Sequence, residues 1–288
     1  MLIIVGSIVV VVCTIGGYMA MGGKLGVLYQ PFELVIIGGA ACGAMIVANT
    51  KTILSGALKA VGRATKGPKH KRDAYVELLT LLYQMFKLAR SKGNLALEKH
   101  VEAPEESDLF SQFPTVQNDH HAMQFICDYL RLLTMGSDNP HELEALMDQD
   151  MEAHHAEEHA VASAVQTMAD GMPALGIVAA VLGVIKTMAS ITEPPEILGG
   201  LIGAALVGSF RFVFLVYGCC GPLASVLNFI TTAAARFYTC IKAGILAHVA
   251  GHPPAIAVEF ARKTLSSDVR PTFYELEEAF ENMSPAAA

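Results

Sequence analysis

The sequence predicts an all-α membrane protein with four transmembrane helices, a helical cytoplasmic domain between the second and third of them, and a cytoplasmic C-terminal helical tail. Composition is the first reason, because 53% of the residues are hydrophobic and only 16% are charged, whereas soluble domains carry about 25% charged residues. The second reason is that the apolar residues form long stretches, and crossing a bilayer takes about 20 such residues. Both features disfavour a soluble protein with an unusually apolar core.

Four stretches with almost no charge mark the expected spans. Apart from Glu33 at the start of the second, the first two contain no charged residue. The third contains only Lys186, and the fourth only Arg211. The N-terminal stretch lacks a basic leading region and is longer than the apolar part of a signal peptide, so we expect it to be retained. The predicted spans are residues 1–21, 32–50, 171–191 and 198–220, and the fourth is expected to continue as a helix toward residue 250.

Positive charges orient these spans. Residues 51–72 contain seven lysines and arginines and no acid, whereas the connection between spans one and two contains only Lys24 and the connection between spans three and four contains none. Basic residues collect on the cytoplasmic side of a membrane, so both chain ends and the middle segment are expected there. The predicted segments are 1–50 with spans one and two, 51–170 as the cytoplasmic helical domain, 171–220 with spans three and four, and 221–288 as a cytoplasmic helical extension and tail.

The middle segment shows helix signals throughout. Residues 74–92 place apolar side chains at helical spacing, and Gly93 is expected to end that helix. Residues 120–135 repeat the pattern. The Asn-Pro pair at 139–140 then begins a run without a helix breaker. We therefore expect a helical bundle whose last helix is long and leads into span three.

Charge and cysteine usage bear on two other classes of protein. The net charge of −7 gives no reason to expect a nucleic-acid partner. The six cysteines show no paired spacing, which predicts free thiols rather than a disulfide framework.

One short motif would suit an enzyme. His155 and His159 fit the H-x-x-E-H pattern of zinc peptidases, in which two histidines on one helix face bind the metal. A solvated helix face of alternating acids and histidines explains the same residues, and the pattern lacks an evident third ligand. A membrane metallopeptidase is therefore an alternative, while we expect no bound metal and no catalytic residue.

The interiors of the predicted spans contain no aspartate, glutamate or histidine. A proton or sodium pathway needs an ionisable group at membrane depth. The chain therefore either moves no ions or receives the carboxylate from a partner. Pro173, at the start of span three, can begin or bend a helix because proline lacks an N–H donor; a kink without a functional role is the other explanation.

Four long stretches carry a resemblance to a known family. They read GGYMAMGGKLGVLYQPFELVIIGGAACGAMIVAN at 16–49, YLRLLTMG at 129–136, MPALGIVAAVLGVIKTM at 172–188 and GHPPAIAVEFARKTLSSDVRPTFYELEE at 251–278. The chain resembles the MotA family of flagellar-motor stator subunits. Its last two spans are also similar to those of the TolQ and ExbB relatives. Those have one span before the cytoplasmic region where two are predicted here, so a TolQ/ExbB-type proton-driven energiser is the second choice.

The resemblance implies a multi-pass protein of the bacterial inner membrane that uses no cofactor. In the family, several copies form a ring, a pentamer, around the single spans of a MotB-type partner that carries the essential aspartate. The transported ion is expected to be the proton. Its flow is converted into torque on the rotor protein FliG, and Arg90 and Glu98 match the family's cytoplasmic charges that meet this rotor protein.

Four further residues match functional positions of the family in and beside the last two spans. Pro173 and Pro222 match the prolines that couple proton passage to movement. Ala180 and Ser209 match positions that line the channel, where the family commonly has threonine in place of Ser209.

The fourth span departs from the family at two positions. Arg211 and Phe212 stand where a leucine and a glycine are usual, which puts the local packing in question. At about 100° per residue, Arg211 lies about 200° around the helix from Ser209. If Ser209 faces the channel, Arg211 faces lipid or a neighbouring subunit. We therefore expect Arg211 to strain packing rather than to block cations.

Overall fold

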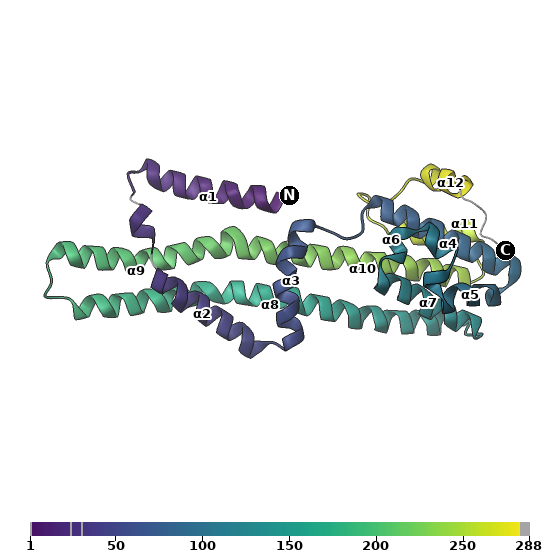
Figure 1. Ribbon diagram of the computed structural model, residues 1–288, viewed down its shortest axis with the longest axis horizontal. Coiled ribbons are helices and arrows are strands. Elements are labelled where there is room, and N and C mark those ends of the chain that lie inside the picture. Colours follow the sequence, from purple (N-terminus) through teal and green to yellow (C-terminus); the bar gives the residue numbers. More distant parts are fainter. Residues whose placement is uncertain (1, 24, 30, 283–288) are drawn as a thin grey trace. The chain divides into compact units, whose positions relative to one another are not determined.

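The computed structural model describes residues 2–23, 25–29 and 31–282, and the regular secondary structure in them is helical throughout (Figure 1). The all-α prediction is therefore confirmed within those residues. The helices form two compact units, one of residues 1–67 and 156–230 and the other of residues 68–155 and 231–288. Two long helices, α8 (Pro140–Ala189) and α10 (Gly221–Val249), contribute to both units.

The first unit is built from apolar helices. Besides its parts of α8 and α10, it contains α1 (Leu2–Ala20), η1 (Leu25–Leu28), α2 (Pro31–Ala48), α3 (Lys51–Lys66), α9 (Pro195–Leu215) and the π-helical turn η5 (Val216–Cys220). Three helical stretches in the described part of the chain are long and apolar enough to cross a membrane, namely 31–48, 140–189 and 216–249. Apolar residues 4–20 and 195–207 form shorter helical stretches. Length and composition thus support three spans, whereas the sequence predicted four.

The predicted fourth span is not one regular helix. Helix α9 ends at Leu215, and α10 begins only after η5. Pro222 supplies a physical reason, because it has no N–H to donate to the carbonyl of Gly218 one α-helical turn earlier. A π turn pairs residues five apart and absorbs such a mismatch within a helix. Beyond the turn, α10 continues to Val249, which confirms the expected helical extension toward residue 250.

Small side chains mediate the packing inside the first unit. Ala57, Ala60 and Ala64 of α3 pack with Ala162 and Val165 of α8 and with Ala224 and Leu227 of α10. Helices α8 and α9 approach closely at a glycine. A Cβ added to Gly183 would lie 2.6 Å from the Cβ of Ala205, so a larger residue would push the two helices apart.

The second unit has a core of large side chains. Its helices are α4 (Arg72–Lys92), α5 (Glu98–Glu102), α6 (Pro114–Gln117), α7 (His120–Thr134), α11 (Pro254–Lys263) and α12 (Phe273–Glu281), together with its parts of α8 and α10. Helix α4 is central to this core. Its Leu78, Leu82 and Phe86 are completely buried, as are Phe237 and Ile241 of α10.

The helix ends predicted for the middle segment are confirmed. Helix α4 stops at Gly93, whose φ of 86° suits glycine and whose N–H donates to the carbonyl of Ala89 at 2.8 Å. Helix α8 begins at Pro140, and the side chain of Asn139 accepts a hydrogen bond from the N–H of His141. From there α8 runs without a break for 50 residues, as the sequence indicated.

Candidate functional site

Pro173 lies inside helix α8 rather than at its beginning. The helix passes through it, and the proline leaves the carbonyl of Ala169 without its usual partner in the helix. Both neighbouring positions of this turn are buried, because Ala169 and Met172 pack with Ala41 of α2 and Val216 of η5. A weakened turn of α8 is therefore held against two other elements of the first unit.

Ala180 lies on the same side of α8 as Pro173. Seven residues separate them, which is close to two helical turns, and both are half-buried. The adjacent Ala179 is buried against Ile37 of α2. Thr187, another seven residues on, is buried and donates its hydroxyl hydrogen to the carbonyl of Gly183 at 2.9 Å. One side of α8 thus contains Pro173, Ala180 and Thr187, and the hydroxyl hydrogen of Thr187 is engaged in a hydrogen bond within the helix.

Ser209 is placed by the backbone of α9 alone. It follows Ala205, the residue in closest contact with Gly183, by one helical turn. The side chains of Ser209, Arg211 and Phe212 lie outside the part of the chain that the structure describes. The expected direction of Arg211 relative to the channel therefore stays a prediction.

Pro222 is the second residue of α10 and is exposed. Proline is tolerated in the first turn of a helix, where an N–H has no partner inside the helix. Four residues earlier, a Cβ at Gly218 would lie 2.8 Å from a methyl group of Val10, so α1 packs closely on η5. Pro173 and Pro222 thus flank the same part of the first unit, because Met172 and Val216 share one buried cluster.

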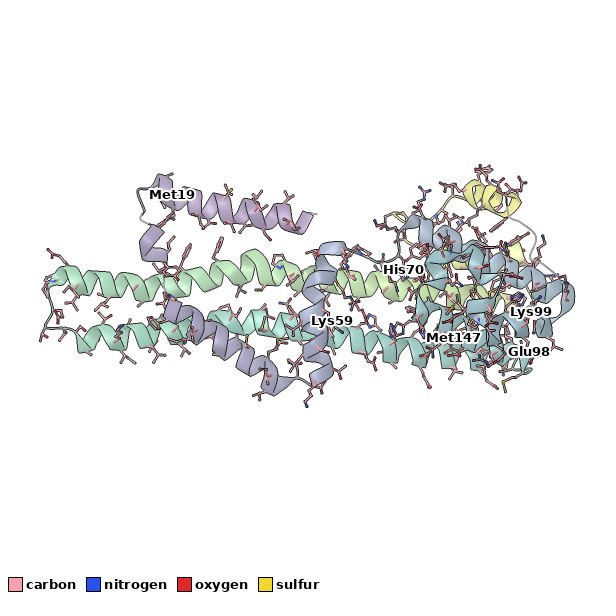
Figure 2. The ribbon with its side chains drawn as sticks, in the orientation of Figure 1. Met19, Lys59, His70, Glu98, Lys99 and Met147 are labelled. Carbon is pink, nitrogen blue, oxygen red and sulfur yellow. The ribbon has the colours of Figure 1, made fainter. Side chains whose placement is uncertain are left out.

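Arg90 and Glu98 lie at the two ends of a short connection in the second unit. Arg90 is in the last turn of α4, and Glu98, labelled in Figure 2, is the first residue of α5. Both side chains are exposed. Neither takes part in an ion pair among the residues that the structure describes. Two exposed charges of opposite sign are thus available to another molecule.

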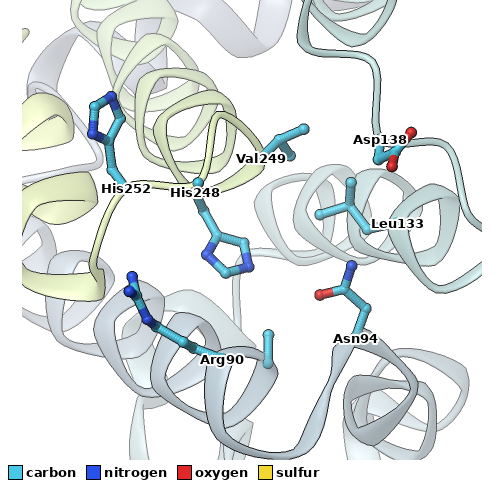
Figure 3. Close-up of a pocket in the computed structure, with 9 residues that line it drawn as sticks. Arg90, Asn94, Leu133, Asp138, His248, Val249 and His252 are labelled. Carbon is cyan, nitrogen blue, oxygen red and sulfur yellow. The ribbon is translucent and has the colours of Figure 1, made fainter.

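A cavity of about 230 Å³ lies beside Arg90, and the sequence did not predict it. Figure 3 shows Asn94, Asp138, His248 and His252 around this space. The imidazole of His248 stacks on Phe86, with ring centroids 4.6 Å apart. Burial, and after it the charge of Arg90, lower the pKa of His248 below its usual range. Arg90 and His248, which are 158 positions apart in the sequence, meet here, and no local sequence pattern signals such a meeting.

A buried polar group ties the start of α4 to the start of α7. The Nε2 atom of His70 lies 2.7 Å from Asp119 Oδ2, and Lys69 Nζ lies 2.9 Å from the same oxygen. The other carboxylate oxygen caps α7 by accepting from the N–H of Ala122. Burial alone would raise the pKa of Asp119, but the hydrogen bonds from His70 and Lys69 outweigh it and lower that pKa. His70 also stacks on Phe237 at 3.7 Å.

The histidine motif has no metal-site geometry around it. His155 and His159 lie on α8, but no group of three or more potential ligands within metal-binding reach occurs in the described ranges. A zinc peptidase needs three protein ligands and an open coordination position. The separate prediction of free thiols is confirmed for Cys13, Cys42, Cys127 and Cys240.

Comparison with known proteins decides between the remaining alternatives. Residues 4–93 match the family model described as Motility protein A N-terminal, and residues 117–214 match the model of the MotA/TolQ/ExbB proton channel family. Motility protein A of Salmonella typhimurium is 44% identical over 278 residues, covering 96% of this chain and 94% of the relative. The chain belongs to the MotA/TolQ/ExbB proton channel family. Chemotaxis protein LafT of Vibrio parahaemolyticus, 39% identical over 94% of this chain and 95% of the relative, is a further similar sequence.

Solved structures share the fold of this family member. The structure of C. jejuni MotAB matches with a TM-score of 0.76 at 19% identity, covering 92% of this chain and 96% of that one. The flagellar MotAB stator complex from Bacillus subtilis matches with a TM-score of 0.72 at 20% identity, covering 94% and 98%.

Family membership settles the class of protein. The chain is a membrane protein and a proton-channel subunit of the motility protein A group, and it is not an enzyme. The match to the Motility protein A N-terminal model over residues 4–93 also separates it from TolQ and ExbB relatives, because that region contains the extra predicted span. The metallopeptidase alternative is therefore dismissed.

Proposed function

We propose that this proton-channel subunit is the torque-generating stator subunit of a flagellar motor and builds its channel together with a MotB-type partner. The main observation behind this proposal is that the predicted spans lack an ionisable side chain for a proton pathway. A proton pathway needs an ionisable side chain at membrane depth, yet the predicted span interiors of this member of a proton channel family contain no aspartate, glutamate or histidine. A single-span partner with an aspartate in its span would supply it. Both solved relatives are complexes of MotA with MotB.

The apolar surface of the first unit supports a ring of several copies, a pentamer in our proposal. On α8, Ile177 is 65% exposed and Ile185 is 60% exposed. Side chains of this kind need lipid, a neighbouring copy or the partner's span to cover them, because apolar surface in contact with water is unfavourable. The close approach at Gly183 shows that the same helices use small residues for contact, which is how helices associate in a bilayer.

Pro173, Ala180, Ser209 and Pro222 are proposed as the coupling and channel positions. Protonation of the partner's carboxylate changes its charge, and therefore its contacts with the side of α8 that contains Pro173 and Ala180. The turn at Pro173 lacks one backbone hydrogen bond and packs against η5 near Pro222. A weakened turn beside a π turn can change conformation at a lower energetic cost than a regular helix.

Arg90 and Glu98 are proposed as the rotor contact, with FliG as the rotor protein. Their exposure and their lack of an ion pair within the described residues support this role. The segment orientation supports it as well. The basic residues at 51–72 support a cytoplasmic location for the second unit and both chain ends. The same proposal gives four spans in the inner membrane.

A complementation experiment tests the proposed function. The chain is expressed in a flagellated bacterium that lacks both of its own stator genes, with and without a MotB-type protein of one span. We expect swimming only when both proteins are present, and we expect it to follow the proton gradient and not the sodium gradient. The proposal would be contradicted if the chain inserts into the membrane but restores swimming with none of the MotB-type partners. Restored outer-membrane energisation in cells lacking TolQ or ExbB would favour the second choice.

A further inference from the structure

Helix α3 presents two faces, and in the described part of the chain the buried contacts of its alanines lie on one of them. The alanines of α3 pack on α8 and α10, as described above. The opposite face carries Lys51, Lys59 and Lys66, all exposed, together with Leu58, which is 82% exposed. Residues 51–72 contain no acidic residue. Lysine 59 is labelled on this helix in Figure 2.

The position of α3 along α8 is fixed by its contacts. Its alanines meet Ala162 and Val165, which precede the predicted span three at residue 171 by six to nine residues. At 1.5 Å per residue this distance is roughly 10 Å. The contacts with Ala224 and Leu227 lie a similar distance beyond the predicted end of span four at residue 220. Headgroups begin where the hydrocarbon ends, so both helices place α3 at the headgroup region.

The direction of α3 supports the same placement. Only Asn49 and Thr50 separate it from α2, so it begins where predicted span two ends. In Figure 1, α3 runs across α8 and α10 rather than along them. A helix that crosses two membrane-spanning helices at the end of their spans lies roughly in the plane of the membrane surface.

One ion pair shows which side of α3 faces the cytoplasm. Arg63 Nη2 contacts both carboxylate oxygens of Glu158, at 2.7 and 3.0 Å. Glu158 precedes Ala162 on α8 and is therefore farther from span three. At about 100° per residue, Leu58 lies about 140° around α3 from Arg63, and the three lysines occupy the sector between them. Leu58 thus points toward the membrane, and the lysines lie along the outer face beside it.

We propose that α3 is a membrane-surface helix that binds anionic lipid headgroups through Lys51, Lys59 and Lys66, with Leu58 inserted among the acyl chains. Charge complementarity favours anionic lipid as the partner of this face, because lysines without neighbouring acids attract negatively charged headgroups. The exposed leucine beside them favours the boundary between headgroups and acyl chains. Long lysine side chains can reach the phosphates while their stems lie along apolar surface. The inference rests on the proposed function through its membrane orientation, and it adds a lipid partner.

Tryptophan fluorescence can test the depth of Leu58. The chain contains no tryptophan, so Leu58→Trp introduces the only indole. The full-length variant is placed in phosphatidylcholine vesicles with and without bromine on the acyl chains. We expect strong quenching by brominated lipid. Leu95→Trp, at a 68% exposed position of the second unit, is the matched control and should not be quenched. Thr65→Trp, about 20° from Leu58 around α3, replaces the first reporter if Leu58→Trp does not insert.

Lipid choice is tested in mixed vesicles in which either phosphatidylglycerol or phosphatidylcholine carries the bromine. Each lysine at an anionic surface is worth up to about a fivefold preference, so brominated phosphatidylglycerol should quench Leu58→Trp more strongly. The added triple change Lys51→Gln, Lys59→Gln and Lys66→Gln should remove that difference. Changing Lys87, Lys92 and Lys99 of the second unit to Gln also removes three charges. This matched control should leave the difference in quenching between the two lipids unchanged.

Two outcomes would overturn the proposal. Absent quenching at position 58 means that water or a second copy of the chain covers this face. Equal quenching by the two lipids means that the lysines do not select anionic headgroups. Swimming of the Leu58→Trp strain separates these failures from failure of the proposed function, because a motile strain with an unquenched indole refutes only the lipid contact.

Discussion

The two units bury opposite kinds of side chain. In the second unit Tyr75, Phe86, Phe110 and Phe237 are fully buried, and the surface is charged. In the first unit the buried contacts are mainly between alanines, while valines and isoleucines are exposed. Apolar surface stabilises a fold only when it leaves water. The second unit therefore carries its own source of stability, whereas the first depends on lipid and neighbouring chains.

The sharpest way to break this comparison is to truncate one large side chain in each unit. Leu78→Ala, at a fully buried position of α4, should lower the free energy of unfolding by about 2–5 kcal/mol because it leaves a cavity. Ile177→Ala, at a 65% exposed position of α8, should change it by less than about 0.5 kcal/mol in detergent. Thermal unfolding of both purified variants, followed by circular dichroism, measures the difference. Equal shifts would contradict the contrast between the units.

A second test removes one buried charge from the second unit. Asp119→Asn keeps a side chain that can cap α7 but loses the carboxylate that His70 and Lys69 contact. Hydrogen bonds to charged groups contribute about 1.5–3 kcal/mol, so we expect a loss of that size at pH 7. Urea unfolding of the two proteins provides the measurement.

The same pair predicts a pH dependence. The pKa of Asp119 is lowered in the folded protein, so its stabilising contribution is present above the unfolded value of about 3.9 and is lost as the pH falls from there toward the folded pKa. The stability of the natural protein should therefore fall more steeply on acidification than that of Asp119→Asn. Parallel pH profiles would show that the carboxylate contributes no linked stability.

The next prediction concerns function without loss of stability. Pro173→Leu restores an N–H that can donate to the carbonyl of Ala169, so α8 should be no less stable and the protein should insert normally. Swimming should nevertheless be abolished, because the weakened turn is gone. Ala174→Leu, at the exposed neighbouring position, is the control and should swim. If Pro173→Leu fails to assemble, the proline is a folding element instead.

The smallest effect on stability is expected at the exposed charges. Arg90→Ala combined with Glu98→Ala should change the free energy of unfolding by less than about 1 kcal/mol, because exposed charges contribute little. Swimming under load should still decrease. Lys92→Ala with Glu105→Ala removes a similar exposed pair and should swim normally. Normal swimming of the Arg90/Glu98 variant would exclude these residues as the rotor contact.

Local signals predicted the helices of the second unit well. Helical spacing identified 74–92 and 120–135, and Gly93 and Pro140 set an end and a start, because such residues act on the backbone within a few positions. Helices α3, α11 and α12 were not assigned individually. The buried face of α3 consists of alanines, which give a weak hydrophobic period although they pack tightly.

Long-range features could not be predicted from the same signals. The π turn η5 was missed because composition identifies an apolar stretch but not the hydrogen-bond register inside it. The roles of six residues rest on the resemblance and stay predictions, namely those of Arg90, Glu98, Pro173, Ala180, Ser209 and Pro222. His248 comes close to Arg90 only through the tertiary fold. In the sequence, the lysines of α3 indicated which side of the membrane is cytoplasmic, but they did not indicate a lipid-binding face.

The number of residues in and beside the turn η5 determines the direction in which the side chains of α10 point. Every residue in an α-helix advances the side chains by about 100°, so a one-residue insertion beside Val216–Cys220 that the π turn does not absorb would rotate the faces of α10 by that angle. Ala224 and Leu227 would then turn away from α3 although no side chain in either helix had changed. This five-residue segment should consequently tolerate substitutions more readily than insertions or deletions.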